Sequence, residues 1–168
     1  MECFKTFRKA PPSQLIMTLL VKNEESMLEE NLLFHKAMGV DSFIITDNNS
    51  TDSTPEIIRK YKQKGWIKEV IEEKATDYEQ KEWVDRMIWK AKTIYKADWI
   101  INADADELWY SPSGNLKTDL SATHANVLNC EMRSVYPEEN QPFWQWDKVV
   151  KPVSEPERYD LSTYSIFE

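Results

Sequence analysis

Four short apolar segments, separated by longer segments with helical periodicity, most constrain the fold of this chain. The first, "LIMTLLV" at residues 15–21, has almost no polar alternation, which is typical of a strand buried on both faces of a parallel sheet. The pattern predicts further strands over residues 41–46, 66–73 and 98–104. Strands that alternate with helices form parallel sheets with right-handed crossovers. We therefore expect an α/β fold with a mostly parallel central sheet flanked by helices.

Helices are predicted between these strands, over residues 22–39, 56–65 and 78–97. Gly39 suits the position after the end of the first helix, and Pro55 suits the first turn of the second. From about residue 111 onward the periodicity weakens, so that part of the chain is predicted only as further short strands.

Polar and acidic residues follow three of the four predicted strands. They are Lys22, Asn23 and Glu24 after the first strand, Asp47, Asn48 and Asn49 after the second, and Asp104, Asp106 and Glu107 after the fourth. The carboxyl ends of parallel strands share one edge of a sheet, and ligands bind in the crevice beyond that edge. The sequence therefore predicts one ligand site, to which all three strand ends contribute.

Asp104 and Asp106 lie two positions apart in "NADADE" and can share a divalent cation if the strand end bends. Their oxygen atoms favour Mg²⁺ or Mn²⁺, and no cysteine or histidine lies nearby in sequence to favour zinc. The segment lacks the glycine and the final glutamate of an EF-hand loop, which argues against a calcium hand. A solvated turn or a helix cap is the alternative interpretation, because this spacing of aspartates is common.

Charge and hydropathy exclude several classes of function. The net charge of −8 argues against a nucleic-acid partner, which would require a basic face. The longest apolar run is far shorter than the roughly 20 residues that span a bilayer, and the N-terminal residues have no long apolar stretch. We therefore expect a cytoplasmic location. Peripheral contact with the inner face of a membrane and a homo-oligomer are both compatible with the sequence.

Three segments in this order resemble family 2 glycosyltransferases of the GT-A fold, whose sheet is Rossmann-like. They are "LIMTLLVKNEESML", "FIITDNNSTDSTPEII" and "ADWIINADADELW", and they span residues 15–109. Within this family, the segments "LLVKNEE" and "ADELW" are most similar to a bacterial branch linked to surface polysaccharide, including lipopolysaccharide. The resemblance implies inverting, metal-dependent transfer of a sugar from a nucleotide-diphosphate sugar, with a UDP-sugar expected, to a saccharide or lipid-linked acceptor.

The resemblance also implies roles for individual residues. The implied nucleotide-binding residues are Asn23, Glu24, Asp47, Asn48, Arg86 and Asp104, and the implied metal-binding residues are Asp104 and Asp106. Asp47 would contact the base or the ribose, and Asp104 would face the ribose or a metal-bound water. Asp106 would bind Mn²⁺ or Mg²⁺ directly and bridge it to the diphosphate. Arg86 would meet a phosphate, although a plain surface charge on its helix is the alternative.

Within a single GT-A domain, residues 1–14 are expected to be a lead-in, residues 15–110 the donor-binding half and residues 111–168 an acceptor-side extension. An inverting transfer needs a general base, which in the family follows the aspartate pair. The acidic residues in this later part are Glu131, Glu138, Glu139, Asp147, Glu155, Glu157 and Asp160. None lies in a recognisable motif, and Glu155 and Asp160 are the candidates. Either this branch differs here, or the chain lacks part of its acceptor region.

Two other functions are weighed against a glycosyltransferase. One is a non-catalytic or fragmentary module that binds a nucleotide sugar. The other is a sugar nucleotidyltransferase, which usually carries a glycine-rich loop after its first strand. The segment "KNEESML" contains no glycine, which argues strongly against the nucleotidyltransferase.

A few further side chains have competing interpretations. Asp52 is expected to be a turn or cap residue, and His35 and His124 are expected to be structural or solvated. Trp144 and Trp146 would lie on the same side of a strand, where their rings suit either a sugar acceptor or core packing.

Overall fold

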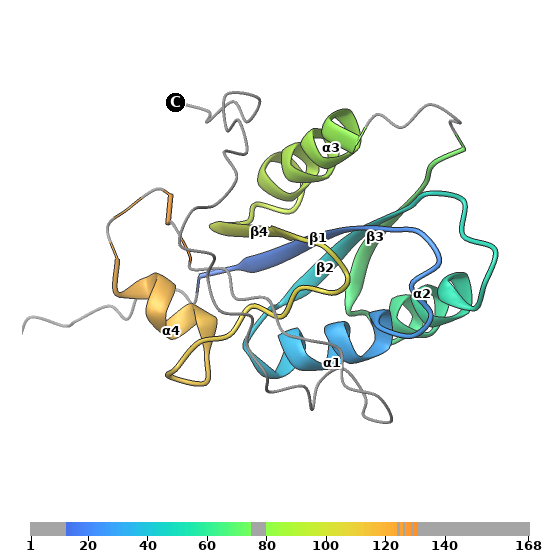
Figure 1. Cartoon of the computed structure of the whole chain (residues 1–168). Helices are drawn as coiled ribbons and strands as arrows, with labels where there is room; N and C mark the ends of the chain where they lie inside the picture. Colours follow the sequence, from blue (N-terminus) through green and yellow to red (C-terminus); the bar gives the residue numbers. More distant parts are fainter. Residues whose placement is uncertain (1–12, 75–79, 124, 126, 129, 131–168) are drawn as a thin grey trace, which may run out of the picture. The chain divides into compact units, whose positions relative to one another are not determined.

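The computed structural model describes residues 13–74, 80–123, 125, 127, 128 and 130 of the 168-residue chain. The chain divides into two compact units, Met1–Asn126 and Val127–Glu168, and all the elements below belong to the first. In chain order they are β1 (Leu15–Val21), α1 (Leu28–Ala37), β2 (Ser42–Asp47), α2 (Thr54–Gln63), β3 (Ile67–Glu72), α3 (Gln80–Thr93), β4 (Trp99–Ala103) and α4 (Leu116–Ser121) (Figure 1). No helix of the described residues is long and apolar enough to cross a membrane.

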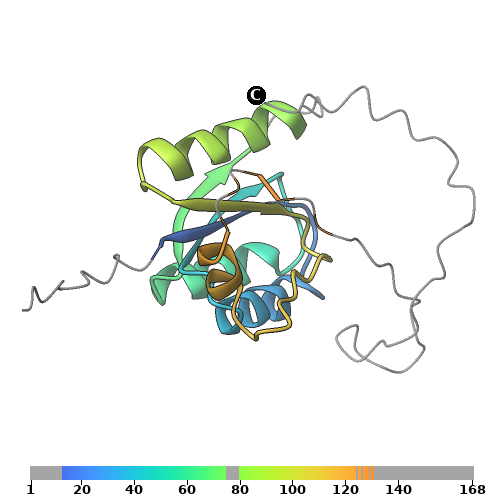
Figure 2. The same ribbon diagram turned by 90° about the vertical axis from the view of Figure 1, so that its left-hand side faces the viewer.

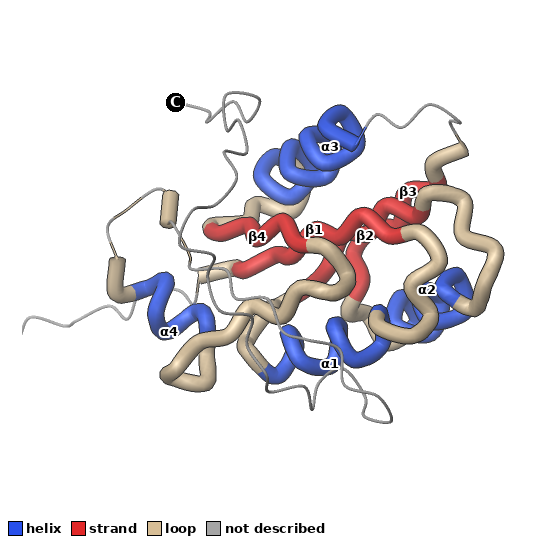
Figure 3. Tube along the Cα trace, in the orientation of Figure 1, coloured by secondary structure: helices blue, strands red, loops and turns tan. Residues whose placement is uncertain are grey.

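The four strands form one parallel sheet in the order β3-β2-β1-β4 (Figure 3). β1 lies in the interior of the sheet, with Val21 opposite Asp47 of β2 and Leu19 opposite Ala103 of β4. The predicted α/β fold with a parallel sheet and flanking helices is therefore confirmed. Because the strands are parallel, the carboxyl ends of β1, β2 and β4 lie along one edge.

Helices cover both faces of the sheet, which explains the unbroken apolar run of β1. On one face, Ile16 and Ile44 pack in a core with Met87 and Ala91 of α3. On the other face, α1, α2 and α4 contribute to a larger core around the alternate residues of β1. Figures 1 and 2 both show α3 alone on one side and the other three helices on the opposite side.

Helix α1 begins later than the periodicity predicted, at Leu28 instead of near residue 22. The intervening segment forms a turn, because Asn23 adopts a φ of 57° and the carbonyl oxygen of Glu24 accepts hydrogen bonds from Met27 and Leu28 N–H. A left-handed residue interrupts a right-handed helix, although asparagine tolerates this conformation well. The extra turn keeps the polar residues that follow β1 at the edge of the sheet.

The end of α1 and the beginning of α4 lie against each other. Gly39 follows the helix end with a φ of 97°, as its position predicted, and a Cβ placed on it would lie 2.8 Å from Asn115 Oδ1. The same Oδ1 accepts hydrogen bonds from the N–H groups of Lys117 at 2.9 Å and Thr118 at 3.3 Å, so Asn115 is the N-cap of α4. Helix α4 was not predicted from the sequence, although an asparagine before a helical turn is a recognised start signal.

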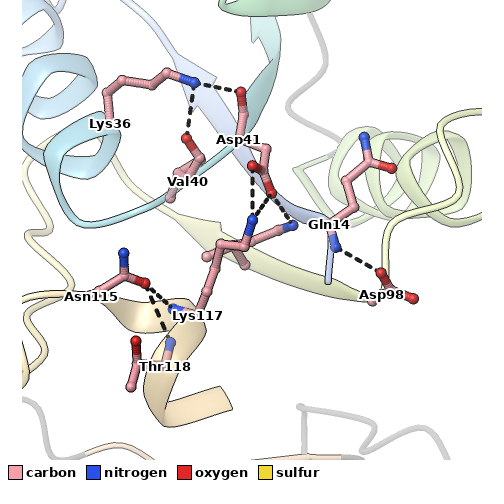
Figure 4. A network of polar contacts seen from close by, with 9 residues as sticks. Gln14, Lys36, Val40, Asp41, Asp98, Asn115, Lys117 and Thr118 are labelled. Atoms are coloured by element: carbon pink, nitrogen blue, oxygen red, sulfur yellow. Dashed lines mark hydrogen bonds and ion pairs between the residues drawn. The ribbon is translucent and has the colours of Figure 1, made fainter. Parts of the chain in front are cut away.

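A network of polar contacts holds the opposite, amino-terminal edge of the sheet (Figure 4). The carboxylate of Asp41 accepts a hydrogen bond from Leu15 N–H at 2.8 Å and forms an ion pair with Lys117 Nζ at 3.0 Å. Asp98 accepts a second hydrogen bond, from Gln14 N–H at 2.7 Å. These side chains satisfy the first donors of β1, which would otherwise lack partners at the strand end.

Candidate functional site

The strand order creates a crevice between the carboxyl ends of β1 and β4. From β1 the chain moves to β2 and β3 on one side, and then crosses to the other side of β1 to form β4. Ligands of open α/β sheets bind at such a switch point. A pocket of about 260 Å³ lies there. Its polar lining comprises Lys22, Glu24, Asn48, Gln80, Asp104 and Asp106.

Three carboxylates in this pocket act on one another electrostatically. Loss of hydration raises the pKa of Glu24, and repulsion from Asp106, Asp52 and Asp104 raises it further. Asp104 is exposed by area, yet loss of hydration at the pocket wall is the larger cause that raises its pKa, with Asp106 the second. Like charges this close disfavour the ionised form, and a cation would relieve that repulsion. Among the described residues, Lys22 is the one cationic residue of the lining.

The chemistry of the lining fits a hard divalent cation. Carboxylate oxygens are the ligands that Mg²⁺ and Mn²⁺ prefer. Among the residues that the structure describes, however, no three or more His, Cys, Asp and Glu side chains are grouped closely enough to hold a metal by themselves. A cation at Asp104 and Asp106 would therefore need ligands from elsewhere, such as substrate phosphates or water.

The loops after β1 and β2 are joined by hydrogen bonds. Asn23 Oδ1 accepts from Thr51 N–H at 2.8 Å, and Asn23 N–H donates to Ser50 Oγ at 2.9 Å. Glu24 N–H donates to Thr54 Oγ1 at 2.7 Å. Asn23 is absent from the pocket lining. Glu24, whose backbone N–H is bound to Thr54, is part of the lining. The structure thus gives Asn23 a role in shaping the loops, and its predicted place near a nucleoside stays a prediction.

The residues after β2 divide in the same way. Asn48 is 4% exposed, donates through its N–H to Val21 O at 2.8 Å and lines the pocket. Asp47 is 9% exposed, accepts from Ser50 N–H at 3.1 Å and does not line it. Asp52 accepts from Glu25 and Thr54 N–H groups, so its expected role as a turn residue is confirmed.

Arg86 lies on α3 and does not line the pocket. Its guanidinium forms an ion pair with Glu73 at 2.8 Å, just beyond the end of β3. Arg86 Nε is buried without a hydrogen-bond partner among the described residues. The structure places this side chain against Glu73, and its contact with a phosphate stays a prediction.

Two buried side chains of α1, which were not assigned to the site from the sequence, hold the segment that carries the aspartates. Asn31 Nδ2 donates to Ala105 O at 2.9 Å and to Glu107 O at 3.0 Å. His35 Nε2 accepts from Trp109 N–H at 2.9 Å. His35 is fully buried, so the expectation of a structural residue is confirmed. An asparagine on the buried face of an apolar helix was the available signal, because such a side chain needs hydrogen-bond partners.

Several predicted residues lie outside the described residues. They are Glu155 and Asp160, the candidates for a general base, together with His124, Trp144 and Trp146. The same holds for most of the acceptor-side extension, so the boundary expected after residue 110 also stays a prediction.

Comparison with known proteins gives one family match. The model of glycosyltransferase family 92 matches residues 17–164, which is most of the chain. Curated protein sequences give no match. Among solved structures, the fold is similar to that of the mannosyltransferase PcManGT from Pyrobaculum calidifontis in complex with GDP-Man and Mn²⁺, at 18% identity and a TM-score of 0.46. That similarity covers 61% of this chain, which spans only 30% of the length of the mannosyltransferase.

Proposed function

We propose that this chain, which belongs to glycosyltransferase family 92, transfers a sugar from a nucleotide-diphosphate sugar to a saccharide or lipid-linked acceptor. The glycosyltransferase class agrees with the resemblance found in the sequence. The narrower assignment to family 2 and to a bacterial surface-polysaccharide branch is not confirmed. A UDP-sugar donor, inversion and a requirement for a divalent cation are therefore parts of the proposal.

The observation that carries the proposal is the pocket between β1 and β4 with its three carboxylates. Asp104 and Asp106 would hold Mn²⁺ or Mg²⁺. A bound cation would supply Lewis-acid stabilisation of the negative charge on the departing diphosphate. Glu24 and Asn48 would contact the nucleoside, and Lys22 would approach a phosphate.

Three further residues of the predicted donor set lie outside the pocket lining. Asn23 and Asp47 order the loops that frame it, through their hydrogen bonds to Thr51 and Ser50. Either could still reach the base or ribose of a donor that extends beyond the pocket. Arg86 would reach a phosphate only by leaving Glu73.

The proposed reaction is a displacement at the anomeric carbon. An acceptor hydroxyl oxygen forms the new bond to that carbon as the bond to the diphosphate oxygen breaks, which inverts the configuration. A general base removes the hydroxyl proton. Glu155 and Asp160 remain the candidates for this base.

Nucleotide binding gives the direct test. The full chain is titrated calorimetrically with UDP, GDP, ADP and CDP, each with Mn²⁺, Mg²⁺ or EDTA. We expect one nucleoside diphosphate, UDP according to the proposal, to bind in the presence of a cation and to bind much more weakly in EDTA. Asp106→Asn should remove the cation-dependent part of the affinity.

Asp85→Asn is the matched control. It removes the same charge from a side chain on α3 that pairs with Lys81 and does not line the pocket, so binding should be unchanged. Binding that is equally strong in EDTA and in Asp106→Asn would refute the cation site. The absence of binding to every nucleotide by a folded protein would refute the proposed donor site as a whole.

Release of nucleoside diphosphate from the donor separates transfer from binding alone. A catalyst should release the diphosphate from its nucleotide sugar, slowly to water and faster with a suitable acceptor. A binding module would retain the intact donor. A sugar nucleotidyltransferase would instead release pyrophosphate from a nucleoside triphosphate and a sugar phosphate.

A further inference from the structure

We infer that Asn31 and His35 are positioning residues that fix the carboxylate turn, residues 104–107, in the conformation that binds a cation. This inference rests on the proposed function, because it concerns how tightly that cation is held. Neither side chain lines the pocket, and neither would touch the cation. Both would act through the backbone of the turn.

The carboxylate turn is a tight turn after the end of β4. Glu107 N–H donates to Asp104 O at 3.1 Å, and Glu107 Oε2 accepts from Asp104 N–H at 3.3 Å. All three residues Asp104, Ala105 and Asp106 line the pocket, where the two aspartates are exposed and Ala105 is buried. The turn therefore places two carboxylates on the same side.

Asn31 fastens this turn to α1. Its amide nitrogen donates to Ala105 O at 2.9 Å and to Glu107 O at 3.0 Å, and it lies 3.5 Å from Asp104 O. Asn31 is fully buried. Only the amide nitrogen can face these carbonyl oxygens, because the amide oxygen would repel them, so the orientation of the side chain is fixed by chemistry.

His35 completes the arrangement one helical turn further on. Its Nε2 lies 2.9 Å from Trp109 N–H, which can only donate, so Nε2 must accept. Nδ1 therefore carries the proton, and it lies 2.9 Å from both Asn31 Oδ1 and Asn31 O. The ring orients the asparagine amide and also anchors the chain just beyond the turn.

The result is that backbone groups on both sides of Asp106 are held. The carbonyl groups of Ala105 and Glu107 are bound to Asn31, and Trp109 N–H is bound to His35. Repulsion between the two aspartates favours their separation when no cation is present, and these hydrogen bonds oppose it. Outer partners that orient metal ligands typically contribute about 10–100-fold in metal affinity.

A purely structural role for these residues predicts a different behaviour. Loss of the hydrogen bonds would then lower the stability of the fold. The affinity for the cation would change no more than in another variant that is destabilised to the same extent. Leu32→Ala supplies that comparison, because Leu32 is a fully buried neighbour on α1 that packs in the core. Its loss removes buried apolar contacts but none of the hydrogen bonds that hold the turn.

The test measures the affinity of the full chain for Mn²⁺ by electron paramagnetic resonance, with free Mn²⁺ as the signal. Asn31→Leu keeps the approximate shape of the side chain and removes its hydrogen bonds. We expect it to weaken Mn²⁺ binding by about 10–100-fold, whereas Leu32→Ala binds like the wild type. His35→Gln retains an acceptor for Trp109 N–H and should lose less affinity than His35→Leu.

The outcomes separate this inference from the proposed function. Wild-type affinity in a folded Asn31→Leu variant overturns the inference and leaves the proposed function intact. Equal losses in Asn31→Leu and Leu32→Ala also overturn it. If Asn31→Leu does not fold, the difference between His35→Gln and His35→Leu decides. If the wild type binds no Mn²⁺, or if Asp106→Asn leaves the Mn²⁺ affinity unchanged, both this inference and the proposed cation site are overturned.

Discussion

The ring of His35 accepts a hydrogen bond from the backbone N–H of Trp109 at 2.9 Å, across 74 residues of sequence. This contact joins α1 to the segment that follows the carboxylate turn. Because Nε2 accepts this bond, the fully buried ring must be neutral. Protonation of one side chain is therefore linked to the stability of the fold.

Stability should decline in acid because of His35. Burial lowers its pKa from the usual 6.5 to about 4. Above pH 6.5 the ring is neutral in both states, and below it the unfolded chain takes up a proton that the folded chain does not. The free energy of unfolding should therefore fall between about pH 6.5 and pH 4, by up to roughly 3 kcal/mol from this group.

Urea unfolding of the wild type and of His35→Gln across this pH range measures the effect. Both proteins contain the same carboxylates, so the difference between their curves isolates the histidine. The wild type should lose its advantage over the variant as the pH falls. Parallel curves would contradict the prediction.

Replacement of Gly39 by alanine should destabilise the protein more than the same change at Gly65. Both glycines have positive φ values, 97° and 76°, which cost an alanine about 1–2 kcal/mol. Only at Gly39 would the new Cβ meet another group, Asn115, at 2.8–3.0 Å. Thermal unfolding should show the larger loss for Gly39→Ala.

The double variant Gly39→Ala/Asn115→Ala checks the cause. Removing the asparagine relieves the clash but also removes the N-cap of α4, at a cost of about 1 kcal/mol. The double variant should therefore lose less stability than the sum of the losses in the two single variants. Strict additivity would show that Asn115 simply moves aside.

At the amino-terminal edge, Asp41→Ala should cost more stability than Lys117→Met. Asp41 accepts from Leu15 N–H and from Lys117 Nζ, so its loss leaves the backbone donor without its partner, at about 1–3 kcal/mol. The lysine contributes only a partly exposed ion pair, at about 0–1 kcal/mol, which salt should weaken. Urea unfolding at low and high salt distinguishes the two; equal losses would contradict this assignment.

Lys22→Gln should weaken binding of UDP and Mn²⁺ more than Arg86→Gln does. Lys22 lines the pocket, whereas Arg86 pairs with Glu73 outside it. Loss of a charged phosphate contact should weaken binding by about tenfold. Calorimetry on both variants decides between them, and a larger effect at Arg86 would support the phosphate contact that the sequence predicted for it.

The fold and the position of the candidate pocket were readable from the sequence for a physical reason. A strand covered on both faces must be apolar throughout, which made β1 and β2 visible. Polar residues directly after such strands must lie at the carboxyl edge, whatever the details of the loops. Glu24, Asn48, Asp104 and Asp106 were found in this way, and all four line the pocket.

The direction of each side chain was not readable, because it depends on the conformation of the loop. Asn23 has a φ of 57°, and its side chain turns to Thr51 and away from the pocket. The partners of Asn31 were equally hidden, since hydrogen bonds to residues 73–76 positions away leave no local pattern. Its burial could be inferred, but the segment that it contacts could not.

The hydrogen bonds from Asn31 and His35 to the carboxylate turn and to Trp109 also have a consequence for biosynthesis. Asn31 and His35 are translated long before Ala105, Glu107 and Trp109, the residues that they hold. The nascent chain therefore contains Asn31 and His35 without their hydrogen-bond partners until β4 has emerged from the ribosome and paired with β1. Until then the aspartates lack the hydrogen-bonded turn that, under the proposed function, would hold them for a cation.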